Sequence, residues 1–243
     1  MNRKILTVLL LTVLATGIAA VVANTQFASA VGGAKSTNGI KFDKNNFSNP
    51  LKIDNKYFPL KPGTTFVYQG TKEGEHASDK FIVTDRTKDV NGITARVVRD
   101  NAYENGILTE FTDDWFAQDD DGNVWYMGEF TTEVETNSNE GSWEAGVNGG
   151  KAGIFMEANP KVGDSYQQEF AKGIAEDRAE IVSITDSICV PYGCFTNVLE
   201  TKETTPIEPT VEEHKFFASG VGDIKEKLFS GGSEVLKLTQ IKS

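Results

Sequence analysis

Apolar and polar residues alternate along most of the chain from Tyr57 onward. Successive side chains of a β-strand point to opposite faces, so this alternation predicts strands with one buried face. Beyond the first thirty residues, no stretch shows the 3.6-residue apolar period of an amphipathic helix. The predicted strands cover residues 65–69, 81–84, 94–103, 107–116, 124–134, 165–170, 179–188, 195–202, 214–217, 223–229 and 234–241.

Strong turn dipeptides separate these strands. Asn91-Gly92, Asn105-Gly106 and Asp121-Gly122 each lie between two alternating stretches, where a hairpin needs residues that accept positive φ. Ten or more short strands joined by hairpins exceed what a flat sheet tolerates. We therefore predict an all-β fold, with one antiparallel sheet curled into a barrel or half-barrel and a β-sandwich as the alternative.

The first thirty residues have the order of a secretory signal peptide. Arg3 and Lys4 precede the uncharged run Ile5 to Ala23, and the small residues Ala28-Ser29-Ala30 follow it. This order predicts a cleaved signal over residues 1–30 and a secreted protein, or one that is extracytoplasmic at the cell surface. The apolar run is also just long enough to span a bilayer, so an uncleaved membrane anchor is the alternative.

The remaining chain divides into two parts by composition. Residues 31–55 are rich in Asn, Lys, Gly and Ser and predict a polar linker or arm, and residues 56–243 predict a single β domain. Of 24 basic residues, 22 remain without Arg3 and Lys4, and they face 35 acidic residues, which gives a net charge of −13. Such a surface repels phosphate backbones, so nucleic acid is not expected as a partner.

Cys189 and Cys194 are the two cysteines of the chain, and they bracket Val190-Pro191-Tyr192-Gly193. A four-residue loop places its flanking residues opposite each other on a hairpin, at a spacing that suits a disulfide. Export favours the oxidised form. We predict a Cys189–Cys194 disulfide, which contributes about 2 kcal/mol in the chain-entropy model because its loop is short.

The densest acidic cluster surrounds Asp121-Gly122. Its oxygen-bearing side chains include Asp119, Asp121 and Asn123. The order of an EF-hand loop is absent, so the first interpretation is a hairpin turn, and a weak Ca²⁺ site on these three residues is the alternative. No cofactor is expected apart from this weak possibility of Ca²⁺.

The segment from Gly141 to Pro160 is Gly-rich, and we expect an irregular loop without strands of its own. It contains Trp143, Glu144, Phe155 and Met156, which are the candidate ligand-binding residues. Loops of this length are usually functional or packed as a lid. Two interpretations remain open, a flap that contacts a ligand and a plug that closes one end of the core.

Several short strings along the chain resemble an uncharacterised family of exported prokaryotic β-domain proteins. This resemblance implies a signal peptide followed by one β domain, and a weaker similarity links the chain to curled-sheet envelope domains of the lipoprotein-carrier type. The family has no established activity to transfer, and it usually has a small residue at the position of Cys194. The strings are YFPLKPGTT at 57–65, DGNVWY at 121–126, GSWEAG at 141–146, NPKVGD at 159–164, VPYG at 190–193 and SGVG at 219–222.

No nucleophile, metal or phosphate-binding motif indicates an enzyme. His214 follows Glu213 directly, and on a strand the two side chains point to opposite faces, so they do not form an acid–base pair. The leading hypothesis is a non-catalytic extracytoplasmic binding domain for a small apolar ligand or an envelope protein. A cell-surface structural or adhesion module and a secreted hydrolase with paired carboxylates are the alternatives.

Overall fold

The computed structural model describes residues 40–243; the predicted signal peptide (1–30) and the first part of the predicted arm (31–39) lie outside the described residues. A 3-10 turn, η1 (Lys44–Asn46), precedes fourteen strands, and no helix in the described part of the chain is long and apolar enough to cross a membrane. The strands are β1 (Thr65–Lys72), β2 (Glu75–Val90), β3 (Ile93–Glu104), β4 (Ile107–Gln118), β5 (Val124–Glu133), β6 (Trp143–Glu144), β7 (Lys151–Met156), β8 (Ser165–Gln167), β9 (Glu169–Phe170), β10 (Arg178–Val190), β11 (Gly193–Thr204), β12 (Glu212–Ala218), β13 (Gly222–Ser230) and β14 (Glu234–Lys242).

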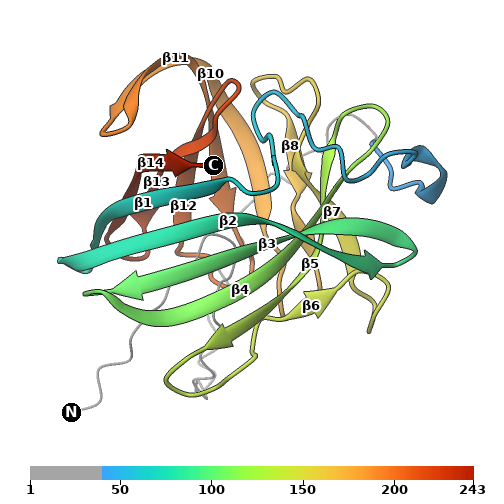
Figure 1. Ribbon diagram of the computed structural model, residues 1–243, viewed down its shortest axis with the longest axis horizontal. Helices are drawn as coiled ribbons and strands as arrows, with labels where there is room; N and C mark the ends of the chain where they lie inside the picture. The colour runs from blue at the N-terminus through green and yellow to red at the C-terminus, as the bar shows by residue number, and fades with distance from the viewer. Residues whose placement is uncertain (1–39) are drawn as a thin grey trace, which may run out of the picture.

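The strands form one antiparallel sheet that is nearly closed into a barrel, as the sequence predicted. Its order is β8-β10-β11-β12-β13-β14-β1-β2-β3-β4-β5-β7-β9, with β6 paired to β5. β7 and β8 contact each other, which brings the two ends of this order together. The long strands β2 to β5 run side by side as one curved wall, and the β10–β11 hairpin curls over at the top (Figure 1).

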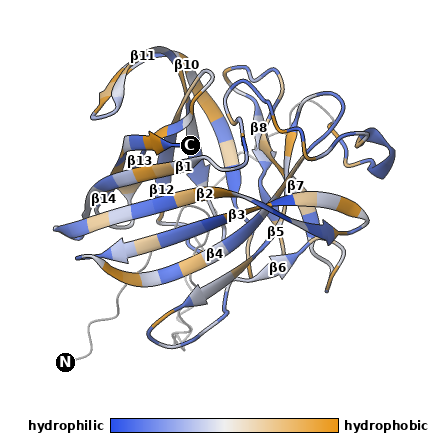
Figure 2. Cartoon of the chain, viewed as in Figure 1, coloured by the Kyte–Doolittle hydropathy of each residue, from blue (hydrophilic) through white to orange (hydrophobic). Residues whose placement is uncertain are grey.

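The hairpin turns lie where the sequence placed them. Asn91 and Gly92 join β2 to β3 with φ of 52° and 82°, and Asn105 and Gly106 join β3 to β4 with φ of 51° and 80°. Two successive residues of positive φ match the right-handed twist of the flanking strands, which explains the Asn-Gly pairs. Hydrophobic and hydrophilic residues alternate along much of the connected strands (Figure 2).

The segment 141–160 differs from the sequence prediction, because it contains two strands. β6 pairs with β5 at Gly128 and Glu129, while β7 pairs with the earlier part of β5, from Val124 to Tyr126. β5 thus has two successive partners on one edge. Gly128 allows the first of them, since a Cβ at that position would lie 2.4 Å from the carbonyl oxygen of Trp143. The expectation of an irregular loop without strands is therefore wrong.

The strand register divides the barrel interior into an aromatic end and a carboxylate end. Phe66 lies opposite Phe81, whereas Tyr68 lies opposite Asp79 on the same inner face. The aromatic end consists of Phe58, Phe66, Phe81, Phe116, Phe155 and Phe217, all buried. The carboxylate end consists of Asp79, Asp100, Glu110, Asp114, Glu129, Glu169, Glu203, Glu213, Asp223, Glu226 and Glu234, also buried.

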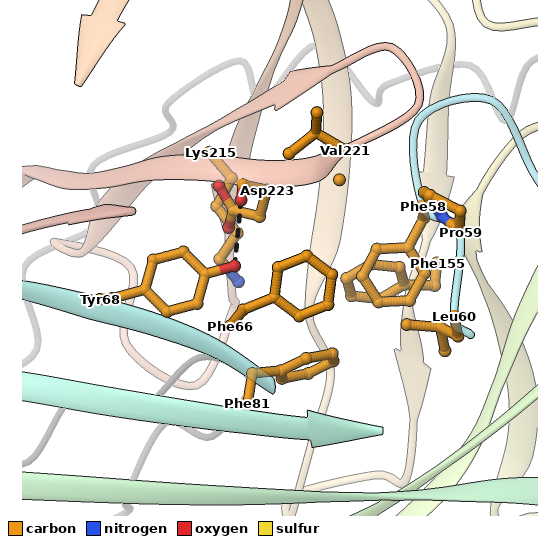
Figure 3. Close-up of a pocket in the computed structure, with 11 residues that line it drawn as sticks. Phe58, Pro59, Leu60, Phe66, Tyr68, Phe81, Phe155, Lys215, Val221 and Asp223 are labelled. Carbon is orange, nitrogen blue, oxygen red and sulfur yellow. Dashed lines mark hydrogen bonds between the residues drawn. The ribbon is translucent and has the colours of Figure 1, made fainter. Parts of the chain in front are cut away.

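A short segment before β1 closes the aromatic end. The Phe58 ring lies 5.2 Å from the Phe116 ring and 4.2 Å from the Phe155 ring. Figure 3 shows Phe58, Pro59 and Leu60 beside the Phe155 ring, with Tyr68, Lys215 and Asp223 on the other side of the pocket. The cavity left between them is only about 10 Å³, which holds one water molecule at most. This end is a filled core.

The described part of the predicted arm lies against the barrel. The Phe42 ring packs edge-on against Trp125 with 5.2 Å between centroids, and Ile53 is buried. Asn46 donates a hydrogen bond to Asp121, which holds η1 beside the β4–β5 turn. The proposed division into segments 1–30, 31–55 and 56–243 remains a prediction.

Candidate functional site

A groove of about 560 Å³ opens at the edge of the sheet between β6 and the β9–β10 connection, and residues from both faces of the sheet line it. We call it the seam groove. One wall comes from β5, β6 and the loop after β6, and the other from β9 and the turn that follows it. The lining residues are Trp115, Glu129, Phe130, Ser142, Trp143, Glu144, Val147, Asn148, Gly149, Gly150, Lys151, Phe170, Ala171, Lys172 and Ile174.

Four large apolar side chains of this lining are exposed. Phe130 is 46% exposed, Val147 48%, Phe170 38% and Ile174 43%. Single exposed apolar residues are ordinary, but several that converge on one concave surface mark a binding site more often than chance. The groove also falls within the 300–1,000 Å³ that is usual for small-molecule sites.

The structure brings Trp143 and Glu144 to the seam groove. Trp143 is 6% exposed, and its ring packs edge-on against Tyr126 at 5.5 Å. Glu144 lies on the opposite face of β6 and pairs with Lys88 at 3.1 Å, while the Lys88 ammonium lies over the Trp115 ring. Two of the four candidate ligand-binding residues thus line one groove.

Phe155 and Met156 lie elsewhere, in the core. They are the last two residues of β7, and both are buried. Phe155 packs among the rings of the aromatic end, 5.1 Å from Phe116 and 6.4 Å from Phe217. The segment 141–160 therefore contributes both a groove wall and a core strand, and its role as a ligand flap stays a prediction.

Glu129 lies on the floor of the groove and belongs to a buried cluster with Tyr126 and Asp114. The Tyr126 hydroxyl lies 2.7 Å from Oδ1 of Asp114 and 2.9 Å from Oε2 of Glu129. A phenol has one proton to donate, so one of these two contacts must come from a protonated carboxyl that donates to the phenol oxygen. Burial, and then the charge of the other carboxyl, raise the pKa of Glu129 well above its usual range.

The rest of the carboxylate end shows the same effect. Burial raises the pKa of Asp79 and of Glu213 to about 7 and that of Glu234 to about 8. Lys215 is a fully buried cation of this end, and its ammonium lies 2.9 Å from Glu203 and 3.6 Å from Glu213. Many of these carboxyls are therefore neutral at pH 7, which limits the cost of burying them.

Sequence reasoning missed the carboxylate end. The alternation was visible, because Asp79, Phe81 and Val83 occupy successive inward positions of one strand. Inward acids were not expected, since Asp and Glu are almost never buried without a partner. The signal that could have revealed these buried acids is an acid two residues from an inward apolar residue on the same strand. Asp100 and Val98 on β3 are an example.

The acidic turn is held by hydrogen bonds within the protein. Asp119 accepts from the backbone N–H and the side-chain amide of Asn123 and from Nε1 of Trp125, while Asp121 accepts from Asn46. Gly122 has a φ of 94°. Within residues 40–243 no group of three or more His, Cys, Asp or Glu side chains has a metal-binding arrangement. Ca²⁺ binding at Asp119, Asp121 and Asn123 stays a prediction.

The disulfide between Cys189 and Cys194 is formed, as predicted. The two residues lie opposite each other at the end of the β10–β11 hairpin, with 4.0 Å between their Cα atoms. The backbone N–H of Tyr192 donates to the carbonyl of Leu238 at 3.1 Å, which ties the hairpin tip to β14. The disulfide fixes a structural hairpin and lies outside the seam groove.

His214 is a part-buried strand histidine that two carboxylates hold in place. Its Nδ1 lies 2.6 Å from Glu200 and its Nε2 3.2 Å from Glu212, and its ring packs on Phe229 at 4.1 Å. Glu213 points to the opposite face, into the interior, as the strand alternation required.

Comparisons with known proteins give no family. No protein-family model matches the chain, and no curated protein matches it. Two solved structures align with this chain: one is named as an exported protein with a YMCC-like fold from Bacteroides fragilis, the other as a lipoprotein from Parabacteroides distasonis. Each is 15% identical in sequence, has a TM-score of 0.46, and aligns over 78% of this chain and 100% of its own.

Proposed function

We propose that this chain is an exported, non-catalytic binding protein that holds an apolar molecule in the seam groove. The observation that carries the proposal is the convergence of Phe130, Val147, Phe170 and Ile174, all exposed, on one groove of about 560 Å³. Burying such side chains against an apolar ligand is favourable by about 25 cal/mol per Å². Trp143 adds an aromatic surface at the floor.

Export is part of the proposal and has two supports. The first is the order of charged, apolar and small residues over positions 1–30. The second is the Cys189–Cys194 disulfide, because such bonds persist in oxidising compartments outside the cytoplasm.

The test is a titration with 1-decanol, followed by tryptophan fluorescence, since Trp115 and Trp143 line the groove. We expect saturable binding of one molecule per chain. The double variant Val147→Ser/Ile174→Ser should weaken it at least tenfold. The matched control is Ile107→Ser/Val162→Ser, which removes the same two residue types at exposed positions outside the groove.

Each outcome decides the proposal. Weaker binding in the groove variant alone supports it. Equal binding by both variants would place the ligand elsewhere. If the wild-type protein bound none of 1-decanol, decylamine and decanoate, the small-ligand function would be removed and an envelope protein would be left as the partner.

A hydrolase with paired carboxylates is a second candidate, because Glu129 and Glu144 both line the groove. The strand register argues against it. Glu129 lies opposite Trp143, and Glu144 lies opposite Gly128, so the two carboxyl groups leave the sheet on opposite faces. A glycosidase needs both acids to flank one bond of the substrate.

A further inference from the structure

The floor of the seam groove is chemically unlike its rim. Glu129 is 1% exposed, yet it lines the groove, and its Oε1 has no hydrogen-bond partner among residues 40–243. The same holds for Oδ2 of Asp114, behind it. A buried carboxyl oxygen without a partner destabilises the protein, and a ligand that donates a hydrogen bond to it would remove that cost.

The groups that face Glu129 are nearly all acidic. They are Glu110 and Asp114 from β4, Tyr126 from β5, Glu169 from β9 and Asp177 ahead of β10. Lys215 on β12 is the cation that acts on Glu169 from the interior. None of the ion pairs formed within residues 40–243 involves Glu129, Asp114 or Glu169.

Two of the three lysines near the rim are turned to other partners, and the third, Lys172, is exposed on the turn after β9. The Lys88 ammonium pairs with Glu144, and the Lys151 ammonium lies over the Phe170 ring at 4.6 Å. The groove thus combines an apolar rim with an acidic floor that has no paired cation of its own. A ligand that matches both parts is apolar at one end and donates hydrogen bonds, with positive charge, at the other.

We propose that the seam groove selects amphipathic amines, whose apolar part packs on the rim and whose ammonium group donates to Oε1 of Glu129. The inference rests on the proposed function and names the ligand class of the same site. An alcohol supplies one donor and no charge, whereas an ammonium supplies three donors and a positive charge.

Binding of an ammonium shifts a proton. In the free protein we place the carboxyl proton of the Asp114–Tyr126–Glu129 cluster on Glu129, which donates it to the phenol oxygen while the phenol donates to Asp114. The bound ammonium keeps its own protons and favours the Glu129 carboxylate, so one proton leaves the cluster for the solvent. The affinity for an amine should therefore rise with pH, and that for an alcohol should not.

The experiment is isothermal titration calorimetry of the full-length protein with three ligands of equal chain length: decylamine hydrochloride, 1-decanol and sodium decanoate. We expect decylamine to bind at least tenfold more tightly than 1-decanol. Glu129→Gln should lose at least tenfold for the amine and less than twofold for the alcohol. The control Glu140→Gln makes the same change at an exposed position outside the groove and should behave as wild type.

A second measurement needs no variant. For the wild-type protein, repeating the amine titration in two buffers of different ionisation enthalpy measures the protons released, and we expect about one per bound amine. Equal affinities for amine and alcohol, tighter binding of decanoate, or no proton release would overturn the amine inference and leave the groove proposal standing. If none of the three ligands binds, the proposed function itself fails.

Discussion

The two ends of the barrel interior are built from the same strands but by opposite chemistry. At the aromatic end Phe58, Phe116 and Phe155 lie within 5.2 Å of one another, and the space between the rings is filled. At the carboxylate end the same inner face carries acids such as Asp100 and Asp114. Apolar burial stabilises the folded state, whereas burying a carboxyl costs free energy even when it is protonated. The difference indicates that the aromatic end stabilises the fold, and we propose that the carboxylate end serves binding.

The largest effect should follow from opening the aromatic end. Phe116→Ala removes a fully buried ring that contacts Phe58, Tyr126 and Phe155, and it should lower the free energy of unfolding by about 3–5 kcal/mol. The matched change at the other end, Asp100→Asn, should cost less than about 1 kcal/mol or stabilise, because it replaces a buried acid by a neutral side chain of similar shape. Urea unfolding of both variants measures the difference, and a larger loss for Asp100→Asn would reverse the comparison.

Removing the Lys215 charge should have the next largest effect on the free energy of unfolding, and this effect should depend on pH. Lys215→Met leaves Glu203 and Glu213 without the cation that lies between them, and breaking a buried pair in this way costs about 3 kcal/mol. At pH 5 the loss should be smaller, because the pKa of Glu213 is raised to about 7 and this acid is then protonated.

The control for Lys215 is Lys237→Met, an exposed lysine on β14. It should change the unfolding free energy by less than about 0.5 kcal/mol at either pH. Chemical denaturation at pH 5 and pH 8 measures both variants. An equal loss for Lys215→Met at the two pH values would show that the neighbouring acids keep one charge state throughout.

A third effect comes from the raised pKa values themselves. A carboxyl whose pKa is higher in the folded than in the unfolded state stabilises the fold fully below the unfolded pKa, and this contribution is lost as pH rises through the folded pKa. For Glu234 the window runs from 4.5 to about 8. Unfolding free energies measured across that window should fall by up to about 1.4 kcal/mol per pH unit from this group. Glu234→Gln should flatten the dependence of the unfolding free energy on pH. An unchanged slope would show that the pKa of Glu234 is the same in the folded and unfolded states.

The barrel could be predicted from the sequence because the features that specify it, turn dipeptides and alternation within a strand, involve residues close together in the chain. Asn91-Gly92 and Asn105-Gly106 specify tight hairpins by their positive φ, and the alternation between them specifies which face is buried. The strand at 81–84 was predicted too short, since β2 extends from Glu75 to Val90. Its polar ends pair with β3 through the backbone, which residue hydrophobicity does not report.

The candidate site could be predicted only in part. Trp143 and Glu144 stood out as an aromatic and an acid in a Gly-rich segment, and they line the groove. The opposite wall, with Phe170 and Ile174, comes from a distant part of the chain and meets them only because the sheet closes. Glu129 was missed because a glutamate in a sequence is expected on the solvent-facing side of its strand. Only the strand register shows that Glu129 lies opposite the buried Trp143.

The smallest effect should separate the two faces of a single strand. Asp113 and Asp114 are neighbours on β4, one outside and one inside the barrel. Partial burial raises the pKa of Asp113, but hydrogen bonds from Arg99 and Arg86 outweigh it and leave that pKa below its usual value. A carboxyl with a lowered pKa stabilises the fold above its unfolded pKa and loses this contribution as pH falls through its folded pKa. Asp113→Asn should therefore cost about 1 kcal/mol at pH 7, and less below pH 4.

Asp114→Asn should have the opposite sign or no effect at pH 7, because burial raises the pKa of Asp114 well above its usual range. The amide oxygen of the new Asn can still accept from Tyr126, so the local packing is retained. Thermal and urea unfolding of the two variants at pH 7 and pH 4 compare the faces directly. If both substitutions destabilise equally at pH 7, the Asp114 carboxyl is charged in the folded protein, and the acidic floor of the groove already holds the negative charge that an ammonium ligand needs.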